Sequence, residues 1–213
     1  MKKLFIFLFA ICLAQIANAQ FRIEAGGAYG GFGNNNIFLF KTISLNTSRN
    51  IASGMGFDVN VSYNIKLDGN EKNVGLSIAP GVGYFMNNVS IKGESGTLRT
   101  QWIQVPLCVV YDAPIGYSSC TLVSSVGLYY GYALKGTYID PTGTNNGFDF
   151  INAPVGERLL RRNDFGFCAK LGLLITKNIG FYLGYNRGFL DISDSRGYVA
   201  RLNSFRFGVM LSL

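Results

Sequence analysis

The chain has 213 residues, of which 48% are hydrophobic, and carries a formal net charge of +7. This length corresponds to one domain. The positive charge contains no run of Lys or Arg, which argues against a nucleic-acid partner. His is absent, so the residue that most often serves as a general base is missing, and we expect no catalytic site, metal site or cofactor.

Residues 1–19 have the pattern of a secretory signal peptide. Two lysines precede an apolar segment over residues 4–13, and Ala17-Asn18-Ala19 provides small residues around a cleavage site. We expect cleavage after this motif, so that the mature domain is 20–213, with 17 basic and 12 acidic residues. A lipoprotein signal ending at Cys12 is the alternative, but the residues before this cysteine match that motif poorly.

Beyond residue 20, apolar residues recur at every second position in eight segments. A period of two is typical of a strand with one apolar face. The predicted outward positions are, in chain order, Phe21, Ile23, Ala25 and Tyr29; Phe57, Val59, Val61, Tyr63 and Ile65; Val74, Leu76, Ile78, Val82 and Tyr84; Ile103, Val105, Leu107, Val109 and Tyr111; Leu122, Val126, Leu128, Tyr130 and Tyr132; Phe165, Phe167, Ala169, Leu171, Leu173 and Ile175; Phe181, Leu183, Tyr185 and Phe189; and Phe205, Phe207, Val209, Leu211 and Leu213. Segments of about ten residues or more can cross a bilayer when they are tilted by about 45°.

The connections between these segments alternate between long and short. They are 31–53, 67–73, 86–97, 112–119, 137–162, 177–180 and 190–201. Long loops at one end and short turns at the other are typical of outer-membrane barrels, whose turns and termini face the periplasm. The sequence therefore predicts an all-β fold: an eight-stranded antiparallel up-and-down transmembrane β-barrel in the outer membrane of a Gram-negative bacterium, with periplasmic termini. A soluble ligand-binding β-barrel is the alternative architecture.

The two faces of the predicted strands differ in chemistry. Tyrosines at outward positions near strand ends suggest an aromatic girdle at the membrane interfaces. The inward series is small and polar, so we expect no apolar core inside the barrel. Because eight strands leave an interior just wide enough for side chains, the inward charges should pair across a packed, wet lumen. These charges are Arg22, Glu24, Asp58, Lys170 and Arg206. Inward glycines leave a narrow solute channel as an alternative.

Prolines and cysteines modify this scheme. Pro80 and Pro106 fall inside predicted strands, and because proline removes a ladder donor, we expect a β-bulge at each. The mature chain has three cysteines, and this odd number argues against a disulfide framework. Alternation points Cys108 inward and Cys120 outward, although a bulge at Pro106 would change the facing of Cys108.

The predicted loop 137–162 is the best candidate for a contact surface. Its aromatic residues are Tyr138, Phe148 and Phe150, and its basic residues are Arg158, Arg161 and Arg162. The arginines are either ordinary solvated charge or a site of attraction for anionic lipid phosphates. A variable loop without any partner is the alternative for the whole segment.

Three short motifs occur in a defined order along the chain: Trp102-Ile103-Gln104-Val105-Pro106-Leu107, then Asp164-Phe165-Gly166, and finally the segment from Gly184 to Ile192. Together they resemble the PorT-like family of small Gram-negative outer-membrane barrels over residues 21–213. Two positions depart from that pattern, Phe189 in the last motif and the C-terminal Leu213. The resemblance implies an eight-stranded barrel without catalytic residues. The namesake of the family is associated with protein secretion.

These observations predict a non-enzymatic outer-membrane protein with a structural or interaction role at the cell surface. The resemblance adds an accessory role in secretion or envelope assembly as a hypothesis. The expected partners are outer-membrane lipids and lipopolysaccharide, the barrel-assembly machinery during insertion, and an unidentified envelope or secretion protein.

Overall fold

The described part of the chain forms an antiparallel barrel. The computed structural model describes residues 20–33, 50–51, 54–67, 75–92, 97–116, 120–139, 145–149, 160–193 and 200–213. Within them the strands are β1 (Gln20–Gly33), β2 (Asn50–Ile51), β3 (Gly54–Lys66), β4 (Gly75–Lys92), β5 (Thr97–Pro114), β6 (Thr121–Ile139), β7 (Asn145–Asp149), β8 (Asn163–Leu174), β9 (Ile179–Gly188) and β10 (Arg201–Ser212). The predicted signal peptide, 1–19, lies outside the described residues.

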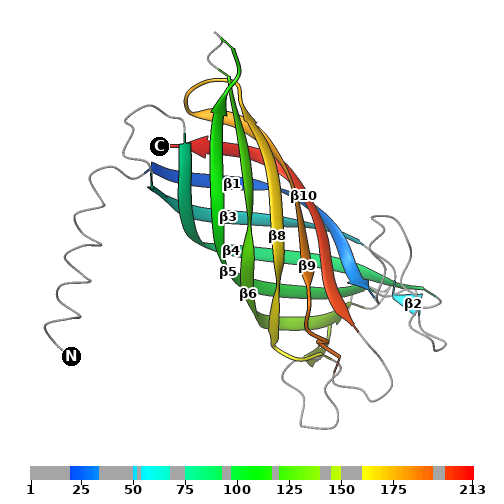
Figure 1. Cartoon of the computed structure of the whole chain (residues 1–213). Coiled ribbons are helices and arrows are strands. Elements are labelled where there is room, and N and C mark those ends of the chain that lie inside the picture. Colours follow the sequence, from blue (N-terminus) through cyan, green and yellow to red (C-terminus); the bar gives the residue numbers. More distant parts are fainter. Residues whose placement is uncertain are drawn as a thin grey trace, which may run out of the picture.

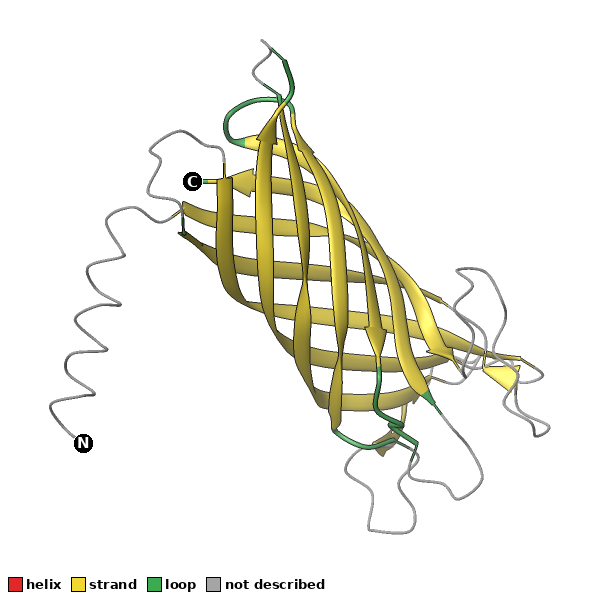
Figure 2. Cartoon of the chain, viewed as in Figure 1, coloured by secondary structure: helices red, strands yellow, loops and turns green. Residues whose placement is uncertain are grey.

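Eight of these strands close into a ring (Figures 1 and 2). Each ring strand pairs with the next along the chain, in the order β1-β3-β4-β5-β6-β8-β9-β10, and β1 also pairs with β10. The two short strands lie outside the ring, where β2 pairs with β4 and β7 pairs with β6. The predicted eight-stranded antiparallel up-and-down barrel is therefore confirmed.

The two ends of the barrel differ. Gln20 and Leu213 lie at one end, called the terminal end below, and β2 lies at the opposite, loop end (Figure 1). The ring strands are joined by 67–74, 115–120 and 175–178 at the terminal end, and by 34–53, 93–96, 140–162 and 189–200 at the loop end. The long connection predicted over 86–97 is wrong. Val89 pairs with Leu98, and both are fully buried, because their inward apolar side chains continue the alternation past the polar Asn87-Asn88.

The outer face of the barrel is apolar. Along β9, Ile179, Phe181 and Leu183 are each at least 55% exposed, whereas the residues between them are buried. The tyrosines predicted to point outward do so: Tyr29, Tyr111, Tyr130 and Tyr132 are exposed, and Tyr63 and Tyr84 are half-buried against Phe21 and Phe57. A continuous exposed apolar surface of this kind marks a membrane or protein contact. Among the described residues, no helix is long and apolar enough to cross a membrane.

The interior contains two apolar clusters, which corrects the expectation of a lumen without an apolar core. The loop-end cluster consists of Ala28, Phe32, Phe85, Val89, Leu98, Trp102, Ala133, Leu160, Ile192, Ala200 and Leu202. The terminal-end cluster consists of Ala79, Val110, Val123, Leu174, Tyr182 and Met210. Small and polar residues of the inward series occupy the middle of the barrel and reach its terminal end, where Arg22, Asn64 and Asp112 are buried. The loop-end cluster also includes Leu160, Ile192 and Ala200 from loop segments.

The β-bulges predicted at Pro80 and Pro106 are absent from the described ladders. Pairing between β4 and β5 is interrupted after Pro80–Leu107 and resumes at Gly83–Gln104 in the same register. Pairing between β3 and β4 is likewise interrupted between Ser62–Gly81 and Ile65–Ile78, again in one register. Pro80 therefore falls in the gap between β3 and β4, and Pro106 falls in the gap between β4 and β5. The missing donors are absorbed without an extra residue. The facing of the following residues is unchanged, and Cys108 points into the lumen as alternation predicted.

Two glycines allow the barrel to close tightly. Gly26 on β1 is paired with Gly208 on β10, the two strands that complete the ring. A Cβ added to Gly208 would lie 2.6 Å from the Gly26 Cα atom, and one added to Gly26 would lie 2.7 Å from the Gly208 Cα atom. Side chains cannot occupy these positions unless the two strands move apart.

We expect the substitution Gly208→Ala to lower the free energy of unfolding by about 1–3 kcal/mol, the range typical of overpacking. Gly184→Ala is the matched control, because a Cβ there would lie 3.5 Å from its nearest neighbour, the Ala169 carbonyl oxygen. Urea unfolding of both variants in detergent measures the difference. Equal stability of the two variants would contradict the close approach of β1 and β10.

Candidate functional site

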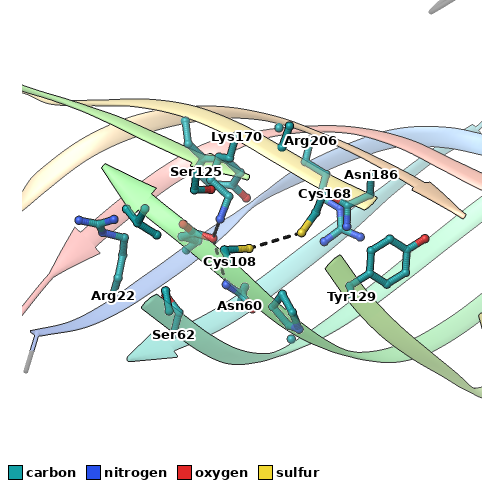
Figure 3. Close-up of a pocket in the computed structure, with 18 of the residues that line it drawn as sticks. Arg22, Asn60, Ser62, Cys108, Ser125, Tyr129, Cys168, Lys170, Asn186 and Arg206 are labelled. Carbon is teal, nitrogen blue, oxygen red and sulfur yellow. Dashed lines mark hydrogen bonds and ion pairs between the residues drawn. The ribbon is translucent and has the colours of Figure 1, made fainter. Parts of the chain in front are cut away.

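A band of charged and polar side chains occupies the lumen from the loop-end cluster to the terminal end, where it is interleaved with the terminal-end cluster (Figure 3). Its charged members come from β1, β3, β5, β8 and β10, so they converge from several walls of the barrel. They are Arg22, Glu24, Asp58, Asp112, Lys170 and Arg206. In so narrow an interior each side chain meets the opposite wall, and a charge removed from water needs an opposite charge.

These six charges form three ion pairs, whereas the fully buried Asp164 carboxyl group on β8 instead accepts a hydrogen bond of 2.7 Å from the Tyr129 hydroxyl. The Lys170 ammonium donates to the Glu24 carboxylate, which also accepts a hydrogen bond of 3.1 Å from the Asn60 amide. The Arg22 guanidinium donates to Asp112, 3.1 Å away. The band therefore contains strand-to-strand ion pairs that are shielded from solvent.

The third ion pair has several supporting contacts. An Arg206 nitrogen lies 3.8 Å from an Asp58 carboxylate oxygen, and the Tyr182 hydroxyl donates to the same carboxylate over 3.2 Å. The Arg206 guanidinium also donates to the Gln104 side-chain oxygen and lies 4.6 Å from the centre of the Phe85 ring. These contacts join the polar band to the loop-end apolar cluster.

Sequence reasoning missed three members of this arrangement: Asp112, Gln104 and Tyr182. Asp112 lies within the predicted turn 112–119, although it continues the inward alternation of Cys108 and Val110. Extending that alternation by one step identifies Asp112 as an inward residue. Gln104 and Tyr182 are inward by the same period, but the pattern does not name their partners on the opposite wall.

A small enclosed cavity lies within the band. Water can occupy about 50 Å³ of this cavity, which is room for roughly three water molecules at about 15 Å³ each. Three side chains on its wall keep buried polar atoms without a protein partner: Arg22 through Nε, Asn64 through its amide, and Gln104 through Nε2. Buried polar atoms of this kind are commonly satisfied by ordered water.

The loop-end rim is held to the barrel by backbone hydrogen bonds. The Ala133 N–H donates to the Arg162 carbonyl over 2.7 Å, and the Arg161 N–H donates to the Ile192 carbonyl over 2.6 Å. Leu160 and Ile192 are fully buried in the loop-end cluster. The end of the connection 140–162 and the first part of the connection 189–200 therefore fold over the mouth of the barrel.

The structure places two residues of the predicted contact loop and leaves four untested. The Arg162 guanidinium donates to the Tyr132 hydroxyl over 2.8 Å and lies 5.7 Å from the ring centre, while the neighbouring Arg161 is exposed. Tyr138 ends β6 and Phe148 lies in β7, but their side chains are outside the description, as are Phe150 and Arg158 entirely. Among the described residues, no group of three or more Cys, Asp or Glu is arranged to hold a metal ion.

Comparison with known proteins identifies a family. A family model described as outer membrane protein beta-barrel domain matches residues 13–194. The neisserial surface protein A, NspA, is similar in structure with 15% identity and a TM-score of 0.48, covering 90% of this chain and 96% of that chain. The attachment invasion locus protein Ail of Yersinia pestis has 12% identity and a TM-score of 0.46, with coverage of 92% and 99%. OprG from Pseudomonas aeruginosa has 14% identity and a TM-score of 0.44, with coverage of 92% and 96%. No curated protein sequence matches the chain.

We expect Lys170→Met to lower the free energy of unfolding by about 3–5 kcal/mol, because it leaves the buried Glu24 carboxylate without its opposite charge. Lys135→Met makes the same chemical change at an exposed position on β6 and should cost less than about 0.5 kcal/mol. The double variant Lys170→Met/Glu24→Gln should recover most of the loss. Urea unfolding in detergent tests the set, and equal costs for the two lysine variants would contradict a structural ion pair.

Proposed function

Because the chain belongs to the outer membrane protein β-barrel domain family, we propose that it is a closed, non-enzymatic barrel that acts through its loop-end surface. The family accounts for its location in the outer membrane of a Gram-negative bacterium. The observation that carries the proposal is the filled lumen, in which ion pairs and two apolar clusters occupy the axis. A barrel whose interior is filled interacts with its surroundings through its outer surface.

The orientation of the barrel follows from its connections. The terminal end carries both termini of the mature domain and the connections 67–74, 115–120 and 175–178. Outer-membrane barrels carry short turns on the periplasmic side and longer loops outside. We therefore assign the terminal end to the periplasm, with the signal peptide removed after Ala19, and the loop end to the cell exterior.

The filled lumen supports a barrier without a conducting path, in contrast to the narrow-channel alternative. We expect the purified mature protein to give no steady openings in planar bilayers, with a porin of known conductance reconstituted in parallel as the positive control. The enclosed cavity of about 50 Å³ supports this expectation, since a few waters do not form a continuous column. Reproducible single-channel steps from this protein would overturn the proposal and favour a solute channel.

Lipopolysaccharide is the partner class that the loop-end rim fits best. Arg161 and Arg162 lie next to each other at the edge of the apolar outer face, where Arg162 packs on the outward Tyr132. Aromatic residues occupy the interfaces of outer-membrane barrels, so this pair sits at the depth of lipid head groups. Arginine donates several N–H groups in a planar fork that matches the oxygens of a phosphate.

We expect the double variant Arg161→Gln/Arg162→Gln to bind phosphorylated lipid A about thirtyfold more weakly. This factor corresponds to about 1 kcal/mol for each basic residue near an anionic surface. Lys177→Gln, an exposed substitution in the 175–178 turn at the terminal end, should leave binding unchanged. Titration of the detergent-solubilised protein with lipid A and with its dephosphorylated form measures the effect. Equal binding of both lipids by the unmodified protein would exclude phosphate recognition.

A protein partner at the same surface is the second part of the proposed interaction role. The resemblance to PorT-like barrels supports an accessory role in secretion or envelope assembly, and the connection 140–162, within which β7 is paired to the end of β6, is the longest connection at the loop end. We further propose the barrel-assembly machinery as a partner during insertion. Cross-linking in intact envelopes, with and without residues 140–159, is the experiment that identifies such a partner.

A further inference from the structure

Two thiols meet inside the lumen. The Sγ atoms of Cys108 and Cys168 are 3.4 Å apart (Figure 3), and both side chains line the enclosed cavity. They come from β5 and β8, which are separated in the ring by β6. The proposed surface function uses neither cysteine.

The contact between the thiols depends on a glycine in the strand between them. Gly127 on β6 is paired with Cys108 on one side and with Cys168 on the other. A Cβ added to Gly127 would lie 2.9 Å from the Cys108 Sγ atom. Gly127 therefore leaves open the space above β6 in which the two sulfurs meet.

The spacing of the strands opposes a disulfide between these cysteines. Their Cα atoms are separated by two strand spacings, about 9.6 Å at roughly 4.8 Å for each spacing. A disulfide joins Cα atoms that are about 4.4–6.8 Å apart. The curvature of the barrel wall brings the two side chains together, but it shortens the distance between the Cα atoms only in part. We therefore expect the two cysteines to remain thiols.

We propose that Cys108 and Cys168 bind one soft, two-coordinate metal ion, such as Cu(I), between their sulfurs. Thiolates are the ligands that such ions prefer, whereas a tetrahedral ion such as Zn²⁺ needs four ligands. Metal–thiolate bonds of about 2.3 Å on opposite sides of an ion separate the sulfurs by about 4.6 Å. Small rotations of the two side chains into the adjoining cavity would lengthen the distance between the sulfurs from 3.4 Å to this value.

The charges around the site suit the complex that would form. Binding of a monovalent ion by two thiols releases two protons to solvent and leaves a bis-thiolate complex with a charge of minus one. The Lys170 ammonium and the Arg206 guanidinium line the same cavity as the two cysteines. These two cations favour the anionic complex, and the carboxylates of Glu24 and Asp58, which are paired with them, oppose it in part.

Silver(I) is the probe, because it is soft, monovalent and stable to air. The reduced mature protein in detergent is titrated with Ag(I) in competition with a soluble thiol. Ag(I) is added both to the folded barrel and during refolding from urea, since apolar clusters close both ends of the lumen. X-ray absorption of the product reports the number of sulfur neighbours.

The third cysteine supplies the matched control. The Cys120 Sγ atom lies 3.9 Å from the Ile175 carbonyl oxygen near the terminal end, away from the cavity. We expect the unmodified protein and Cys120→Ser to bind one Ag(I) per chain with two sulfur neighbours. Cys108→Ser and Cys168→Ser should each weaken binding by at least about 100-fold, the upper range for loss of an outer-shell partner. Heat-dependent gel mobility verifies that each variant has folded.

Three results would overturn the proposal. The first is equal Ag(I) affinity in Cys108→Ser and the unmodified protein, and the second is the absence of a bound ion after refolding with Ag(I). The third is an intact mass, measured without reductant, that lacks two hydrogens and maps to a Cys108–Cys168 peptide, because it would show a disulfide instead. None of these results bears on the closed lumen or on lipid A binding.

Discussion

The width of an eight-stranded ring is the constraint on which the rest of this structure depends. Side chains that point inward meet those of the opposite wall, so an inward charge has little water to solvate it and is stabilised by a partner there. Glu24 meets Lys170, Asp58 meets Arg206, and Arg22 meets Asp112. Trp102 and Phe85 fill the loop end of this narrow interior, which supports the closed barrel that we propose. The filled interior in turn leaves the outer surface and the rim as the places where the protein can interact.

The strand faces could be predicted from the sequence because they depend only on local alternation. Ile179, Phe181 and Leu183 are outward for the same reason that Tyr182 is inward. Element ends were less predictable, because polar residues that favour turns also occur within long strands. Asn87 lies inside β4, and the apolar residues beyond it decide its structure: Val89 and Leu98 gain burial at the mouth only if the hairpin continues.

Contacts across the barrel could not be predicted from local patterns, since they depend on register and tilt around the ring. Alternation alone points Cys108 and Cys168 inward, but only the pairing of both with Gly127 brings their sulfurs together. The apolar clusters likewise depend on contacts between segments that are distant in the sequence. Leu160 and Ile192 come from loop segments whose return over the mouth is fixed by hydrogen bonds to other elements. The two prolines also depend on register, because each lies at an interruption of a ladder that continues without a bulge.

The layered interior separates two regions that can act independently. The loop-end cluster lies between the rim, where Arg162 packs on Tyr132, and the thiol pair in the polar band. A close-packed apolar layer transmits small displacements poorly into new arrangements unless it has a second packing. Binding at the rim therefore need not alter the lumen, and an ion held by the thiols need not alter the rim. Arg206 contacts both layers, through Asp58 and the Phe85 ring, so it offers a route for coupling between the two regions.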